Sequence, residues 1–223
     1  QNDAEAQYKL GQCYDDAVGV DWDMEKAAEW YKKSAENGNR NAQYQLGRCY
    51  YFGNGVDENE TEAVKWYKRA AERDHAEAQY NLGECYYYGW GVQKNEGEAV
   101  KWYEKAAENY NADAQYELGC CYYNGEGVEK NSAKAVEWYR KSAENGNAFA
   151  QFILGCCYYN GEGMEKNSAK AVEWYRKAAE QGNADAQSNL GYCYESGIGV
   201  EKDVAKAAEW YRKSAEQGNA TAQ

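Results

Sequence analysis

The sequence predicts an all-α solenoid made of six antiparallel helix pairs, each 36 residues long. Three observations predict this fold: a sixfold internal repeat, apolar residues at helical spacing in two segments of each repeat, and glycines between those segments. Self-similarity at a period of about 20–50 residues indicates stacked repeats. Each unit is too small to bury its own apolar face, so its neighbours must cover it. We therefore expect one continuous domain over residues 1–223.

The repeat is marked by the motif Ala-x-Ala-Gln, which opens every copy except an altered one that starts at Arg40. This places the repeats at 4–39, 40–75, 76–111, 112–147, 148–183 and 184–219, with a partial copy at 220–223. A cysteine and a tryptophan recur at fixed positions, such as Cys121 and Trp138 in the fourth repeat. Because the chain stops four residues into a seventh copy, we interpret it as a trimmed chain or a fragment, which leaves further repeats and a removed signal peptide open.

The first segment of the fourth repeat has one apolar face at helical spacing, formed by Ala114, Leu118, Cys121 and Tyr122. Gly119 lies on this face, where a missing side chain would let a second helix approach closely. Gly125 and Gly127 are expected to end the helix, since glycine tolerates the positive φ that a helix end often needs. In the first repeat Ala17 replaces the first of these glycines, so we expect a distorted turn there.

The second segment begins at Asn131, a good N-cap residue whose position holds Asn or Asp in all six repeats. An inward stripe follows at Ala135, Trp138, Tyr139 and Ala143. Gly146 then ends the helix. Asp74 and Tyr110 replace this glycine in the second and third repeats, and there we expect His75 or Asn111 to take the left-handed conformation.

The run from Leu118 to Ala148, LGCCYYNGEGVEKNSAKAVEWYRKSAENGNA, resembles the Sel-1-like repeat (SLR) family, a branch of the tetratricopeptide-like helical repeats. The resemblance extends over essentially the whole chain. It implies a right-handed superhelix in which the first helices line a concave side and the second helices lie outside. It also implies a role as an adaptor or scaffold for protein complexes. Some cysteine-rich members of the family carry a second cysteine per repeat that closes a disulfide, and this chain lacks that residue.

Charge and cysteine content limit the classes of partner. The net charge is −12 and is spread unevenly over the repeats, which argues against nucleic acid because its binding requires clustered Lys and Arg. The sequence contains no apolar run long enough to span a membrane. The recurring cysteine has no partner on the second helix of its repeat, so we interpret these residues as buried thiols rather than disulfides. Reduced thiols favour a cytoplasmic location without excluding export.

No set of residues suggests catalysis, a cofactor or a metal site. The single histidine, His75, lies at a joint between helices and lacks a positioned partner. The recurring Gly-x-Gly-Val lies between helices and does not follow a strand, unlike a phosphate-binding loop. Cys120 and Cys121 are adjacent on a helix and point about 100° apart, so they cannot face one metal ion together. We therefore predict no enzyme, cofactor or metal protein, with a metal or redox role for these cysteines as the weaker alternative.

The positions that the family places on the concave side predict a binding surface. The fifth and twelfth positions carry tyrosines through the central repeats, and these either pack between helices or form a groove. In the fifth repeat Phe149, Phe152, Ile153 and Cys156 make an apolar patch, a feature that usually marks a contact. The candidate partner-binding residues are therefore Tyr80, Tyr87, Tyr116, Tyr123, Phe149, Phe152, Ile153, Cys156 and Tyr159.

These observations favour a non-enzymatic scaffold that binds a peptide or protein segment on its aromatic concave face, anchored by a few aromatic residues. The alternative is a structural protein that associates end to end, because Trp210 and Tyr211 of the last helix have no complete repeat to cover them. The near-identity of the repeats also leaves an engineered origin open, although irregular residues such as Trp90 favour a natural, recently duplicated gene.

Overall fold

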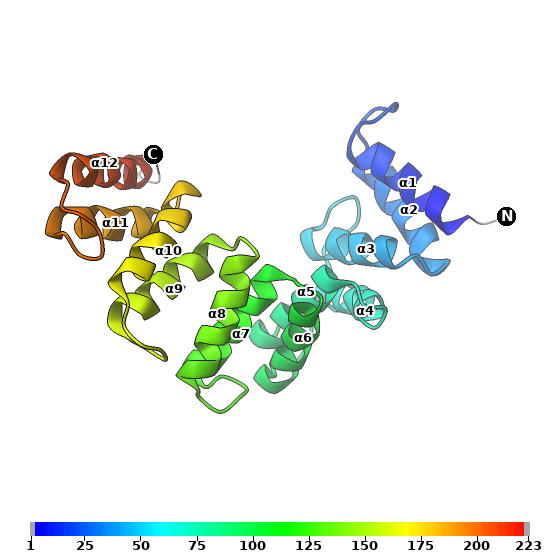
Figure 1. Cartoon of the computed structure of the whole chain (residues 1–223). Helices are drawn as coiled ribbons and strands as arrows, with labels where there is room; N and C mark the ends of the chain where they lie inside the picture. The colour runs from blue at the N-terminus through cyan, green and yellow to red at the C-terminus, as the bar shows by residue number, and fades with distance from the viewer. Residues whose placement is uncertain (1–2, 221–223) are drawn as a thin grey trace. The chain divides into compact units, whose positions relative to one another are not determined.

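The computed structural model describes residues 3–220, and every regular element in that range is an α-helix. The chain divides into two compact units, Gln1–Asn111 and Ala112–Gln223, each of which contains three helix pairs (Figure 1). The first unit contains α1 (Ala4–Asp15), α2 (Met24–Glu36), α3 (Arg40–Phe52), α4 (Glu60–Ala71), α5 (Ala76–Tyr88) and α6 (Glu96–Glu108). The second contains α7 (Ala112–Asn124), α8 (Ser132–Glu144), α9 (Ala148–Asn160), α10 (Ser168–Glu180), α11 (Ala184–Ser196) and α12 (Val204–Ala220). The predicted all-α class is confirmed.

Within each unit the helices pack in chain order. The two helices of every repeat contact each other, and the second helix of one repeat contacts the first helix of the next, as α2 does with α3 and α8 with α9. The prediction of stacked helix pairs is therefore confirmed for each unit. That all six repeats form one continuous domain remains a prediction.

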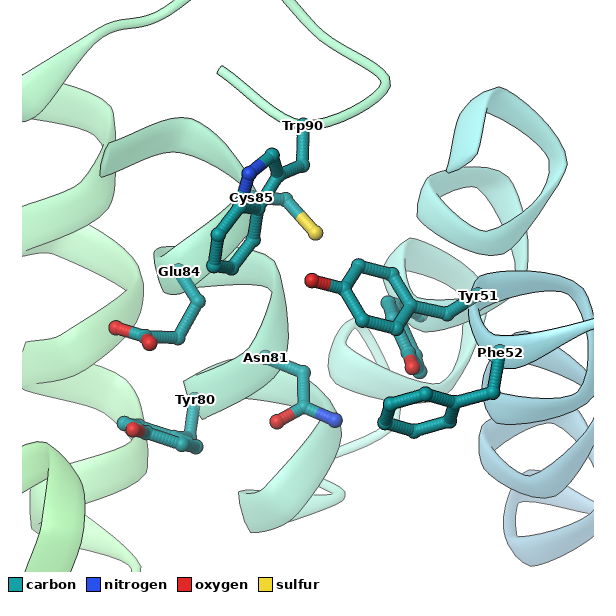
Figure 2. A pocket seen from close by; sticks show the side chains of 8 residues that line it. Tyr51, Phe52, Tyr80, Asn81, Glu84, Cys85 and Trp90 are labelled. Atoms are coloured by element: carbon teal, nitrogen blue, oxygen red, sulfur yellow. The ribbon is translucent and has the colours of Figure 1, made fainter. Parts of the chain in front are cut away.

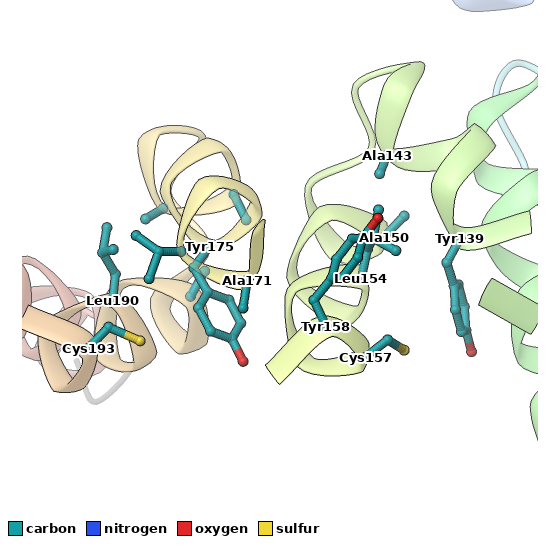
Figure 3. Close-up of a cluster of buried hydrophobic side chains, with 14 of the residues drawn as sticks. Tyr139, Ala143, Ala150, Leu154, Cys157, Tyr158, Ala171, Tyr175, Leu190 and Cys193 are labelled. Atoms are coloured by element: carbon teal, nitrogen blue, oxygen red, sulfur yellow. The ribbon is translucent and has the colours of Figure 1, made fainter. Parts of the chain in front are cut away.

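The same positions of the repeat are buried in successive copies and form the core. One leucine of each first helix is fully buried from the second repeat onward: Leu46, Leu82, Leu118, Leu154 and Leu190. Figure 3 shows part of this core in the second unit, where Leu154 and Cys157 of α9 and Leu190 and Cys193 of α11 hold equivalent places one repeat apart. All eight cysteines are thiols, and five of the six at the recurring position are buried, while Cys13 is half-buried. The thiol interpretation is thus confirmed.

A glycine on each first helix allows the close approach that the sequence predicts. A Cβ atom placed on Gly155 would lie 2.6 Å from Cδ1 of Tyr175, a separation that real Cβ atoms do not show. The other repeats place the same tyrosine ring against the same glycine, as Tyr67 does with Gly47. The missing side chain is therefore what lets the second helix press an aromatic ring onto the first.

The ends of the second helices follow the capping prediction. The side chain of Asn131 accepts a hydrogen bond from the backbone N–H of Lys134 at 3.0 Å, and Asn59 and Asp203 cap their helices in the same way. Each cap satisfies a backbone donor that has no partner within its helix.

The turns depart from expectation at three positions. Asp74 and Tyr110 adopt the left-handed conformation themselves, with φ of 59° and 61°. The expectation that His75 or Asn111 would do so was wrong, because the joint keeps the geometry of Gly146 (φ 94°) whichever residue occupies the position. Ala17 likewise keeps a left-handed turn, with φ of 56°, although α1 ends one residue earlier than the other first helices.

A buried glutamine links successive repeats. The Nε2 of Gln151 donates to the carbonyl of Ala143 at 3.0 Å, which joins α9 to the end of α8, and Gln43, Gln79 and Gln187 repeat this bond. The other end of the amide is also used, since Gln181 donates to Oε1 of Gln151 at 2.8 Å. The Ala-x-Ala-Gln motif therefore encodes the joint between repeats.

Candidate functional site

The candidate site in each unit is the surface of its first helices at repeat positions 2, 5, 6, 9, 12 and 13: α1, α3 and α5 in the first unit, and α7, α9 and α11 in the second. We call this surface the first-helix face. Four large apolar side chains stand more than two-fifths exposed on it: Phe52 (57%), Tyr88 (53%), Phe149 (63%) and Tyr192 (48%). On the described part of the second helices, Val204 is the one such residue. Among helical residues, exposed large apolar side chains therefore lie mostly on the first helices, while Val18, Trp22 and Tyr110 are exposed in the turns.

The aromatic ladder at position 5 rests on the second helices. Its rings lie beside the tyrosine of the partner helix in the same repeat, with ring centroids 6.0 Å apart for Tyr80–Tyr103 and Tyr116–Tyr139 and 6.1 Å apart for Phe152–Tyr175. These rings are half-buried, so they pack the helix pair together and also expose an edge. The rings therefore pack between the helices, and a binding groove formed by them stays a prediction.

Cavities recur at one place between successive repeats. A cavity of about 250 Å³ lies between the first and second repeats, one of about 120 Å³ between the second and third, and one of about 280 Å³ between the fifth and sixth. Each is lined by positions 12 and 13 and the inward tyrosine of one repeat, and by positions 6, 9 and 10 of the next. The cavity therefore recurs at the same place between repeats, and different side chains line it in each case.

The predicted patch of the fifth repeat falls into two parts. Phe149 is exposed and its ring lies 6.3 Å from that of Tyr116 on the preceding first helix. Cys156 and Tyr159 instead line the cavity toward the sixth repeat. Ile153 is half-buried against the core of the second unit, as is Phe152.

The predicted tyrosines at position 12 are partly covered by lysine side chains. The ammonium groups of Lys130 and Lys166 lie 5.4 Å from the ring centroids of Tyr123 and Tyr159. A hydrogen bond to Glu162 is the main cause that raises the pKa of the Tyr123 phenol. In the first unit Tyr87 has Lys94 over its ring at 5.5 Å, and Tyr80 lines the cavity between the second and third repeats.

Cys120 and Cys156 each form a hydrogen bond with the second helix of their own repeat. Each sulfur accepts a hydrogen bond from the inward tyrosine of its repeat, Tyr139 at 3.6 Å and Tyr175 at 3.5 Å. Burial raises the pKa of both thiols, and it raises that of the neighbouring Cys157 to about 12. Thiols with raised pKa stay protonated at neutral pH and are poor nucleophiles.

His75 acts as a structural residue. Its Nδ1 accepts from the backbone N–H of Ala78 at 3.3 Å and caps α5, while its ring stacks on Tyr44 at 4.5 Å. Burial lowers the pKa of the imidazole. Within residues 3–220, no three His, Cys, Asp or Glu side chains come together as a metal site would require, and no helix is both long and apolar enough to cross a membrane.

Sequence reasoning missed three aromatic residues of the first unit. Phe52 and Trp90 line the cavity between the second and third repeats together with Tyr51 (Figure 2), and Tyr88 stacks on Trp90 without lining the cavity. Phe52 and Tyr88 occupy position 13, where the other repeats carry Asp, Asn or Ser, and no other repeat has a tryptophan at position 15. This departure from the repeat pattern was the signal that could have found them.

Comparison with known proteins identifies the family. The Sel1 repeat model matches residues 4–39, 40–75, 76–111, 112–147, 148–183 and 184–219. The chain belongs to the Sel1 repeat family. Sel1 repeat proteins typically serve as scaffolds for protein–protein interaction and are generally not enzymes. No curated protein sequence matches the chain.

Solved structures of Sel1 repeat proteins are similar over nearly all of the chain. The protective antigen c5321 of uropathogenic Escherichia coli, which has an SLR fold, is 43% identical with a TM-score of 0.93. The match covers 97% of this chain but 46% of that protein, so the chain spans less than half of its length. A Sel1 repeat protein from Oxalobacter formigenes is 39% identical with a TM-score of 0.85, over 96% of this chain and 86% of that one. The immunity protein Pa5087 of Pseudomonas aeruginosa shares the fold at 22% identity, over 96% and 81% of the chains, with a TM-score of 0.54.

Proposed function

We propose that this protein is a non-enzymatic scaffold that binds an extended protein segment along the first-helix face. The exposure of Phe149 carries the proposal. Its ring is 63% exposed on α9, at position 2 of its repeat, where the other repeats carry Glu, Asn or Asp. A polar residue satisfies the fold at this position, so packing does not require an aromatic side chain, and exposed aromatic residues are enriched at protein interfaces.

The surroundings of Phe149 supply a second anchor and a rim. Tyr116 lies beside its ring on the preceding first helix, and the half-buried Ile153 lies one turn further along α9. Tyrosine offers a large contact area with few torsions to immobilise and a hydroxyl that can form hydrogen bonds. Binding energy at interfaces concentrates in a few such residues. We assign the anchor to Phe149 and Tyr116, with Tyr123 and Tyr159 nearer the C-terminal ends of the same two helices, α7 and α9.

The test uses peptides selected from a random display library against the intact chain. Phe149→Asp restores the residue found at this position in the fourth and sixth repeats, so the fold should be kept. We expect it to weaken the selected peptides at least tenfold, which corresponds to about 1.4 kcal/mol. Asp185→Asn, at the same position of the sixth repeat, is the matched control and should leave the dissociation constant unchanged.

Two outcomes would contradict the proposal. Peptides that bind Phe149→Asp as tightly as the parent chain would show that the first-helix face of the fifth repeat is not the site. A mass by light scattering that rises with concentration, and that Phe149→Asp reduces to the monomer, would show instead that this surface joins copies of the chain. In that case self-association through this face would replace the scaffold role.

A further inference from the structure

We propose that the cavity between the second and third repeats is a pocket for an arginine side chain of the bound segment. This inference rests on the proposed scaffold function and names the chemistry of one partner residue. The pocket lies in the first unit and uses none of the residues assigned above to the Phe149 anchor.

The pocket is lined by the aromatic rings of Tyr51, Phe52, Tyr67, Tyr80 and Trp90, and Tyr88 packs on one of these rings from outside the lining. The ring of Trp90 stacks on Tyr88, with centroids 4.5 Å apart and planes at 24°, and meets Tyr51 edge-on at 5.8 Å. Tyr51 in turn meets Phe52 at 4.9 Å. The cavity of about 120 Å³ has room for the head of one side chain, and Figure 2 shows the Tyr51 hydroxyl and the Asn81 amide near its centre.

The aromatic residues are not needed by the repeat. Position 13 is Asn124 and Asn160 in the fourth and fifth repeats, and position 15 is Asn54 in the second. The helix pairs form the same turn there with polar side chains, and Phe52 and Tyr88 stand more than half exposed. Stability therefore does not account for the exposed rings of Phe52 and Tyr88, whereas Trp90 both packs against the core of the unit and lines the pocket.

The charges around the pocket are negative. Glu84 lines it, and Glu60 lies behind the loop of Trp90, where its carboxylate accepts from the backbone N–H of Gly91 at 2.9 Å. Burial is the main cause that raises the pKa of the Tyr51 phenol, followed by Cys85 and then by the charges of Glu60, Glu84 and Glu58.

The nearby cations are placed elsewhere. Lys94 lies over Tyr87 and pairs with Glu96 at 2.9 Å, and Arg48 lines the cavity between the first and second repeats. Aromatic faces attract cations, and carboxylates around the rings add to that attraction. Arginine suits this pocket better than lysine, because its planar guanidinium is weakly hydrated, stacks on aromatic rings and offers donors to carboxylate and hydroxyl oxygens. Neutral apolar side chains would gain nothing from Glu58, Glu60 and Glu84.

The experiment follows the indole N–H of Trp90 and the amide of Gly91 by NMR in the intact chain. The probes are two peptides, acetyl-Gly-Ser-Gly-X-Gly-Ser-Gly-amide, where X is arginine or its neutral isostere citrulline. We expect the arginine peptide to shift these signals saturably and to bind roughly tenfold more tightly than the citrulline peptide, since a desolvated cation–π contact and a carboxylate each favour the charged form. Trp90→Asn, which places the residue of the second repeat there, should reduce the shift at Gly91 at least fivefold, measured at a temperature where circular dichroism shows the variant to be folded.

Equal binding of the two peptides by the parent chain would overturn the inference, and so would an unchanged Gly91 shift in Trp90→Asn. The comparison of the two peptides needs no variant, so it decides the question even if the substitution disturbs the fold. The selected peptides test the scaffold proposal independently of the pocket. Selected peptides that depend on Phe149 but not on Trp90, with no preference for arginine over citrulline, would refute the pocket and leave the scaffold standing.

Discussion

Arg73→Asn should stabilise the protein by repairing one incomplete joint between repeats. In four other joints an Asn or Gln side chain donates to Oε1 of the buried glutamine, as Asn109 does to Gln79 at 3.0 Å and Gln181 to Gln151 at 2.8 Å. The second repeat has Arg73 at that position, and Oε1 of Gln43 is buried without a hydrogen-bond partner. An amide at position 73 has the length and the donor to complete the bond.

The size of the effect follows from the burial of Gln43, whose side chain is 6% exposed. An unsatisfied buried polar group costs about 1–3 kcal/mol, and a restored hydrogen bond contributes about 1 kcal/mol net. Arg73 itself is exposed, so its removal should cost little. We therefore expect the free energy of unfolding to rise by about 1 kcal/mol, or the melting temperature by roughly 2–4 °C.

Urea unfolding followed by circular dichroism at 222 nm measures the change, with two comparison variants. Arg73→Ala removes the arginine without supplying a donor and should stay near the parent value. Gln181→Arg creates the same defect at Gln151 and should lose about 1 kcal/mol. If Arg73→Asn and Arg73→Ala have the same midpoint, the missing bond is not what limits this joint and the reasoning fails.

Three further predictions concern the other irregular positions. Tyr110→Gly should stabilise the third joint by about 0.5–1 kcal/mol in thermal melts, because glycine adopts the left-handed conformation at φ 61° without strain, as Gly146 does; a lower melting temperature would refute this. His75→Asn should remove a pH dependence: since the folded-state pKa of His75 is lowered, the parent chain should lose stability as pH falls below about 6.5, and the stability difference between the two chains should change with pH there and become constant above about pH 7.5, where only the lost ring stacking on Tyr44 contributes. Gly155→Ala should cost about 1–3 kcal/mol in urea unfolding, because its Cβ would lie 2.6 Å from the ring of Tyr175; an unchanged midpoint would show that the helices can separate freely.

Most of the fold was predictable because the same residue signals for helices, caps and turns recur in all six repeats. The helix pair, its N-cap at Asn131 and the close approach at Gly119 follow from residue spacing alone, and the structure has all three. The left-handed residues were assigned to the wrong positions in the second and third joints. Residue preference pointed away from Asp74 and Tyr110, whereas the packing of the two flanking helices imposes the glycine geometry on them.

The candidate site was only partly predictable. Apolar substitution in the fifth repeat pointed to Phe149, and the structure exposes it. The cluster around Trp90 was missed because its rings come from two repeats and meet only once α3 and α5 stack side by side. A residue-by-residue comparison of repeats finds the unusual positions, but it cannot show which of them share a cavity.

The glutamine joint has a consequence for how such a chain can change in length. Repeats four and five differ at three of 31 positions between Leu118–Ala148 and Leu154–Ala184, and each begins with the same donor and ends with the same carbonyl. Unequal crossing-over between their coding segments would insert or delete 36 residues and leave every remaining joint with compatible partners. Copy number could therefore vary among descendants of this gene without a penalty in folding, and selection would act on the reach of the array while its joints stayed the same.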